Sequence, residues 1–274
     1  MEENYLDYTS ILPPIPKYFI KIPSDIILDK ELNEMRILCF HYLNQNLTSD
    51  DTVMYCANYM IQFCGYKKNI NRNRKSNTYT KLTDCMSWFH RNGYIVDFDT
   101  QQYKGVVFQC SYADRDKIRS PERFGIIYDF EIKKILEYKA DYRPLSSSVL
   151  LLVLSYLRLM TWKRKNDKDT KPEICRKKYI DIASDIGISE RLASRAIHTL
   201  SELGFIAIRT TPNYQTESGE WRTEDTIFAT PYKFISKSDG FVLADKEQYD
   251  FMEEIERGLK QLQTKTTKNK GENK

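Results

Sequence analysis

The chain has 274 residues, of which 41% are hydrophobic and 29% are charged, a composition typical of a folded protein of about two domains. Its net charge of +4 excludes a polycation, and no apolar run approaches the ~20 residues of a membrane-spanning helix. The first residues, MEENYLDYTS, are acidic and lack the basic and apolar parts of a secretion signal, so we expect a cytoplasmic protein.

The first half of the chain predicts three helices followed by a β-hairpin. Residues 1–17 contain three prolines and predict an irregular leader that packs across the first domain, and residues 18–23 predict an extended segment. Apolar spacing then predicts helices, and two β-rich runs around a polar turn predict the hairpin. The expected helices are 32–43, 52–64 and 76–92, and the expected strands are 94–98 and 105–110. This order is typical of a winged-helix domain, here over residues 18–113.

The second half predicts the same order of elements without convincing residue identity to the first. A charged segment with a Ser-Pro break, residues 114–123, predicts the linker, and residues 124–240 predict a second winged-helix domain. The expected elements are a strand at 124–128, helices at 130–138 and 149–162, a helix-turn-helix at 179–209, and strands at 205–210 and 226–230. The fold class is therefore mainly α with small β-hairpins (α+β).

Beyond the second domain, residues 241–263 predict an amphipathic helix and residues 264–274 a disordered basic tail. The helix either packs on its own domain or contacts a partner, for example in a homodimer.

The helix-turn-helix is the clearest pattern in the chain. Ile180, Ala183 and Ile186 share a face of its first helix, Gly187 can end that helix, and Ser189 can cap the next. The second helix has an apolar stripe, formed by Leu192, Ala193, Ala196, Ile197, Leu200 and Leu203. The opposite face carries Arg191, Ser194, Arg195 and His198. A recognition helix offers such side chains to the major groove, where an Arg can pair with guanine.

Positive charge gathers in two segments, which suits contact with nucleic acid. Residues 66–91 contain seven Lys or Arg against one acid, and residues 158–178 contain nine against three. Further candidates for DNA contact are Lys67, Lys68, Arg72, Arg74 and Lys75 in a basic loop, Asn77, Thr78 and Lys81 at the next helix, and Lys177, Lys178, Arg209 and Arg222 around the helix-turn-helix. Trp88 is expected on the outward face of the helix 76–92. The alternative for the second helix of the helix-turn-helix is a solvated face used for protein contacts, and the alternative for the basic loop is a long solvated insertion.

Cysteine and histidine usage indicates no metal site and no cofactor. Three His and six Cys are scattered, without a CxxC pair, and reduced core cysteines are the plain interpretation in a cytosolic protein. The cysteines are Cys39, Cys56, Cys64, Cys85, Cys110 and Cys175.

Two stretches resemble known DNA-binding proteins. YFIKIPSDIILDKELNEMRILCFHYL, followed by DDTVMYCANYMIQFCGYKKN and a helix ending FHRNGYI, resembles the first winged helix of replication-initiator and replisome-organiser-like proteins of plasmids, prophages and conjugative elements in low-GC Gram-positive bacteria. KKYIDIASDIGISERLASRAIHTLSELGFI is similar to winged-helix domains in general. The resemblance implies two tandem winged helices, binding to repeated DNA at an origin, and recruitment of a host helicase or helicase loader.

We therefore expect a protein that binds double-stranded DNA and is not an enzyme, because the sequence lacks GxxxxGK[ST], HExxH and a clustered His site. A replication initiator or replisome organiser of a mobile element is the first hypothesis. A transcriptional regulator with the same DNA-binding mode and a protein-interaction scaffold built from winged helices remain alternatives. No membrane partner is expected.

Overall fold

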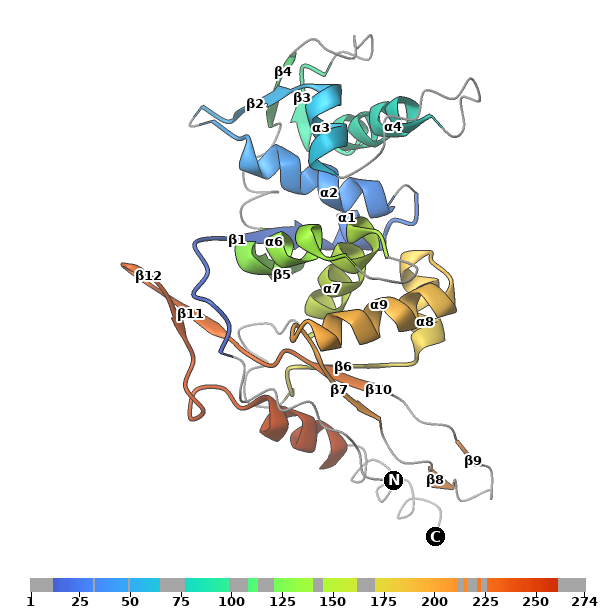
Figure 1. Ribbon diagram of the computed structural model, residues 1–274, viewed down its shortest axis with the longest axis vertical. Coiled ribbons are helices and arrows are strands. Elements are labelled where there is room, and N and C mark those ends of the chain that lie inside the picture. The colour runs from blue at the N-terminus through green and yellow to red at the C-terminus, as the bar shows by residue number, and fades with distance from the viewer. Residues whose placement is uncertain are drawn as a thin grey trace. The chain divides into compact units, whose positions relative to one another are not determined.

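The computed structural model combines helices with small antiparallel sheets (Figure 1). It describes residues 12–31, 33–48, 50–64, 77–98, 108–112, 121–139, 145–161, 171–210, 214–215, 221–222 and 226–260. The chain divides into two compact units. Tyr18–Tyr156 forms the N-terminal unit, and Leu157–Lys274 together with Met1–Lys17 forms the C-terminal unit.

The N-terminal unit contains a helical core and a three-stranded sheet of order β2-β4-β3. Its first elements are β1 (Phe19–Pro23), α1 (Ser24–Leu28), α2 (Asn33–Gln45), β2 (Thr52–Tyr55), α3 (Ala57–Phe63), α4 (Thr78–Arg91), β3 (Ile95–Val96) and β4 (Phe108–Tyr112). β5 (Phe124–Tyr128), α6 (Asp129–Glu137) and α7 (Ser147–Thr161) follow, and α7 ends within the C-terminal unit.

The prediction of a helix over residues 52–64 is wrong for the first third of this segment. Thr52–Tyr55 is a strand instead, and only Ala57–Phe63 is helical. Val53 and Tyr55 are buried while Met54 is 48% exposed, so the side chains alternate as a strand requires. Pairing with β4 satisfies the backbone of this segment, and a local helical pattern cannot reveal such a distant partner.

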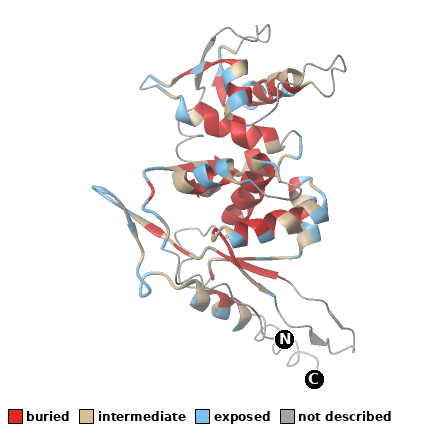
Figure 2. Cartoon of the chain, viewed as in Figure 1, coloured by how far each residue is buried: buried red, intermediate tan, exposed pale blue. Residues whose placement is uncertain are grey.

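The expected linker at residues 114–123 does not separate two compact parts. β5, which follows it, pairs antiparallel with β1 at the start of the same unit. The backbone N–H of Ser24 donates to the carbonyl of Arg123 at 3.0 Å, and that of Asp129 donates to the carbonyl of Tyr18 at 3.2 Å. The boundary between the two units falls between Tyr156 and Leu157, inside α7. This helix is buried from Val149 to Leu159 (Figure 2).

The C-terminal unit contains a second three-stranded sheet with its last strand in the middle, of order β6-β10-β7. Its elements are β6 (Ile174–Lys177), α8 (Tyr179–Ile186), α9 (Glu190–Glu202), β7 (Ala207–Thr210), β8 (Tyr214–Gln215), β9 (Trp221–Arg222), β10 (Thr226–Ala229), β11 (Phe234–Lys237) and β12 (Gly240–Leu243). The strand β6 and the hairpin β11–β12 were not predicted. β2 and β6 each lead into a pair of helices and a later strand pair, so the order of elements is the same in both units.

A helix over residues 251–260 packs on the sheet of the C-terminal unit. Its Ile255 is 2% exposed and joins a core with Ala207, Ile227 and Ala229. The part of the predicted helix 241–263 that forms therefore packs on its own unit, whereas residues 240–243 belong to β12.

The leader residues that the structure describes also lie against the C-terminal unit, and not against the first domain as expected. Leu12 and Pro13 line a cavity of about 340 Å³ together with Tyr232, Tyr249 and Phe251. Within the described part of the chain, every helix is too short or too polar to cross a membrane.

Candidate nucleic-acid interface

The helix-turn-helix forms where the sequence predicts it. α8 ends at Gly187, whose φ of 70° is left-handed, and the N–H of Ile188 returns to the carbonyl of Ala183 at 3.0 Å. The Ser189 hydroxyl oxygen accepts the N–H of Leu192 at 3.3 Å and caps α9. Glycine permits the left-handed turn and serine satisfies an otherwise unpaired N–H, so both local predictions are confirmed.

The buried face of α8 differs from the prediction at one residue. Ile182, Ala183 and Ile186 are buried, but Ile180 is 54% exposed. Six helical positions separate Ile180 from Ile186, which turns the two side chains roughly 120° apart at 3.6 residues per turn. Ile182 takes the place in the core that was expected of Ile180.

α9 buries Ala193, Ala196, Ile197 and Leu200 and leaves the predicted contact face outward. Arg191 and His198 are exposed, and Ser194 and Arg195 are half-buried. These four side chains occupy positions i, i+3, i+4 and i+7, so they form one continuous stripe along the helix. This stripe is called the α9 face below.

The start of α8 lies next to the α9 face. The ring centroids of Tyr179 and His198 are 6.0 Å apart, and Tyr179 also meets Phe228 of β10 edge to face at 6.1 Å. Burial raises the pKa of Tyr179, although a hydrogen bond with Thr226 opposes the increase. Tyr179 thus stays neutral and serves as an anchor between sheet and helix-turn-helix.

The two lysines predicted before α8 have different surroundings. Lys178 is exposed at the residue that precedes the helix. The Lys177 ammonium lies 2.5 Å from an Asp185 carboxylate oxygen on α8, so its charge is already partly neutralised. Lys178 is the better placed of the two to meet an anion.

Arg209 lies on the other face of the sheet from Tyr179. Its Cα partner is Ile227, which belongs to the core under the helix 251–260, whereas Tyr179 contacts the next residue, Phe228. Side chains alternate between the faces of a strand, and so Arg209 does not extend the α9 face. Arg222 belongs to β9, but its side chain lies outside the described residues, as do those of Lys67, Lys68, Arg72, Arg74 and Lys75.

Of the three residues predicted to contact DNA at the start of α4, only Lys81 is exposed. The Asn77 side chain accepts the N–H of Tyr79 at 3.0 Å and caps the helix. Thr78 is 8% exposed. The structure therefore uses Asn77 and Thr78 to begin and pack α4.

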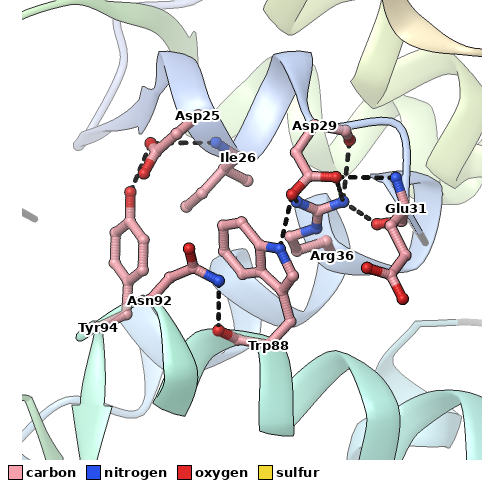
Figure 3. Close-up of polar contacts among 8 residues, drawn as sticks. All are labelled: Asp25, Ile26, Asp29, Glu31, Arg36, Trp88, Asn92 and Tyr94. Atoms are coloured by element: carbon pink, nitrogen blue, oxygen red, sulfur yellow. Dashed lines mark hydrogen bonds and ion pairs between the residues drawn. The ribbon is translucent and has the colours of Figure 1, made fainter.

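Trp88 faces the core of the N-terminal unit, which corrects the prediction that it points outward. It is 4% exposed, and its indole N–H donates to an Asp29 carboxylate oxygen at 2.7 Å (Figure 3). The Arg36 guanidinium stacks over the indole ring, 4.0 Å from its centroid, and lies 3.4 Å from the same carboxylate. A charged pair thus anchors α4 from its inner side.

A second polar contact supports the same anchor. The Tyr94 hydroxyl donates to Asp25 at 2.6 Å, and the Tyr94 ring stacks on Trp88 with centroids 5.8 Å apart. Burial by itself would raise the pKa of Asp29, but hydrogen bonds from the Glu31 N–H and Trp88, with the charge of Arg36, lower it overall. The only advance signal of this cluster was a lone Arg36 within the apolar helix MRILCF.

Comparison with known proteins does not assign the chain to a family. No family model matches the sequence, and a search of curated proteins finds no match. Among the described residues, no group of three or more His, Cys, Asp or Glu side chains could hold a metal ion. Five cysteines in that part of the chain are buried free thiols.

Proposed function

We propose that the C-terminal unit is a winged-helix domain that binds double-stranded DNA with α9 in the major groove. The order α7, β6, α8, α9, β7 and β10 supports this arrangement, as does the central position of β10 in the sheet. The same order in the N-terminal unit supports a tandem pair. β8 and β9 pair with each other in the segment of chain between β7 and β10, which is where a winged-helix domain carries its wing.

The α9 face is the observation that carries the proposal. Two arginines, a serine and a histidine lie on one face of a helix that buries Ala193, Ala196, Ile197 and Leu200 on its opposite side. An Arg on such a face can donate two hydrogen bonds to guanine O6 and N7, which discriminates against other bases by about 1–3 kcal/mol. Lys178, exposed at the start of α8, supplies a nearby cation for a phosphate.

The biological role that we propose is replication initiation or replisome organisation on a mobile element, with recruitment of a helicase or its loader. This part rests on the resemblance of YFIKIPSDIILDKELNEMRILCFHYL and FHRNGYI to such proteins. Mapping of the bound site tests it, because clustered direct repeats beside an AT-rich tract indicate an origin. A single palindrome over a promoter would instead support transcriptional regulation.

Substitution of Arg195 tests the role of α9. Arg195→Ala should lower affinity for the specific duplex more than affinity for an unrelated duplex. Lys67→Ala with Lys68→Ala should weaken both and flatten the dependence on salt, since phosphate contacts carry no sequence information.

The matched control is Arg257→Ala. Arg257 belongs to the helix 251–260, which covers the other face of the sheet, and it pairs with Glu254 at 2.7 Å. Its loss removes the same charge and should leave the affinity for specific DNA unchanged. An equal loss for both duplexes on Arg195→Ala would remove Arg195 from base reading.

A further inference from the structure

α4 and α9 correspond residue by residue, which allows their exposed faces to be compared. The N–H of Tyr94 returns to the carbonyl of Phe89 at 2.8 Å, and the N–H of Phe205 returns to that of Leu200 at 2.9 Å. The residue before each donor is a left-handed glycine, Gly93 with φ 68° and Gly204 with φ 79°.

The buried sides of the two helices follow the same register. Leu82, Cys85, Met86 and Phe89 of α4 occupy the positions of Ala193, Ala196, Ile197 and Leu200 of α9. With the helix ends and cores aligned, the α9 face of Arg191, Ser194, Arg195 and His198 corresponds to Thr80, Thr83, Asp84 and Ser87 in α4.

None of the four corresponding positions of α4 carries an Arg, Lys, Asn or Gln, the side chains that make two hydrogen bonds to one purine. An exposed carboxylate, Asp84, replaces Arg195, and Thr80 replaces Arg191. The Thr83 hydroxyl donates to the carbonyl of Tyr79 at 2.9 Å, so it is occupied within the helix. Lys81 is exposed, but its position corresponds to that of Leu192 and so lies outside the face that matches the α9 face.

Trp88 cannot supply the missing contact. Its indole is held inward by Asp29 and Arg36, so it neither stacks on a base nor wedges between base pairs (Figure 3). The equivalent position in α9 is Thr199, which is also buried.

From these comparisons we infer a division of roles in DNA binding between the two units: α9 reads the base pairs, and α4 does not. The inference rests on the proposed DNA-binding function. Each chain then specifies one short asymmetric block of DNA, since a single recognition helix brings three to four side chains to base edges and reads roughly four base pairs. The N-terminal unit contributes to affinity without contributing to sequence preference.

Selection of bound duplexes from a randomised library, with the full chain, tests the division. We expect one contiguous conserved block of roughly four base pairs, or copies of one identical block where two chains bind. The variant Arg191→Ala with Arg195→Ala should erase the block. For each arginine, the ratio of specific to non-specific affinity should fall about 5- to 150-fold.

The matched variant changes the corresponding face of α4, Thr80→Ala with Asp84→Ala and Ser87→Ala. It should select the same block, and its ratio of specific to non-specific affinity should stay within about twofold of the parent ratio. If this triple variant does not fold, as judged by circular dichroism, Asp84→Asn replaces it with the same expectation.

The failures are distinguishable. A second, different block that disappears in the α4 variant overturns the division while DNA binding itself stands. A chain that retains no duplex from the library at low salt refutes the proposed function and, with it, the division.

Discussion

Replacement of Trp88 by Phe tests the inward orientation of this side chain. Phe keeps most of the apolar ring but loses the N–H that donates to Asp29 at 2.7 Å. A hydrogen bond to a charged group contributes about 1.5–3 kcal/mol, and the lower end applies because the Asp29 side chain is 38% exposed to water. A smaller ring over Arg36 and beside Tyr94 costs about 1 kcal/mol more.

The free energy of unfolding of the N-terminal unit should therefore fall by about 2–3 kcal/mol in Trp88→Phe. Urea unfolding of the full chain, followed by circular dichroism, measures the change as a shift of the transition midpoint at unchanged slope. Tyr59→Phe is the control, because Tyr59 is 62% exposed and its change should stay within about 0.5 kcal/mol.

A double-mutant cycle locates the loss. Trp88→Phe and Asp29→Ala should show a coupling energy of about 1 kcal/mol or more, since each removes one partner of the same hydrogen bond. A change in Trp88→Phe as small as that in Tyr59→Phe would refute the inward orientation, and with it the anchoring of α4 to the α1–α2 turn.

Three further predictions concern stability. Gly204→Ala should cost about 1–2 kcal/mol in thermal or urea unfolding, because Gly204 has φ +79° and no atom within 4 Å of an added Cβ, so the cost is that of the backbone alone. An unchanged midpoint would mean that this turn is not left-handed. Ile255→Ala should destabilise by about 2–5 kcal/mol, because Ile255 is 2% exposed and packs with Ala207, Ile227 and Ala229; an unchanged midpoint would show that the helix 251–260 does not dock on the sheet. Burial lowers the pKa of His41 from 6.5 to about 4, so the unfolded chain binds more protons than the folded chain between these values. The contribution of His41 to the free energy of unfolding is present above pH 6.5 and decreases by about 3 kcal/mol as the pH falls towards 4. His41→Gln should therefore flatten the dependence of the free energy of unfolding on pH in this window. Parallel pH profiles of the variant and the parent would contradict the burial of His41.

Local chemistry predicted the elements whose determinants lie close together in the sequence. Gly187 and Ser189 set the turn and cap of the helix-turn-helix, and the apolar spacing of α9 determined which face is buried. These features depend on neighbours within four residues, so they could be read without a structure.

Features that depend on distant partners were missed. β2 is a strand because β4 lies beside it, and β1 pairs with β5 across roughly a hundred residues of chain. Trp88 turns inward because Asp29 and Arg36 provide a polar partner and a cation for it. Apolar periodicity gives no information about such partners, since it records only which side of a helix is hydrophobic.

The same limit applies to the candidate interface. The sequence identified all four members of the α9 face, because their orientation follows from the helix that carries them. It treated Arg209 and Lys177 as equal members, although the sheet turns Arg209 to the other side and Asp185 pairs with Lys177. Charge counts along a sequence do not show whether a cation is paired with a carboxylate or lies on a different face from the other candidates.

Binding of the full chain to a labelled duplex, measured across a range of salt concentrations, tests whether this protein binds DNA as proposed. We expect tight binding at 50 mM salt that weakens steeply, by roughly 10³–10⁵-fold at 200 mM for 6–10 phosphate contacts. Arg191→Ala with Arg195→Ala should bind the selected duplex no better than an unrelated one. Failure to bind any duplex at 50 mM salt would contradict DNA binding, and a double variant that kept its preference for the selected sequence would contradict base reading by α9.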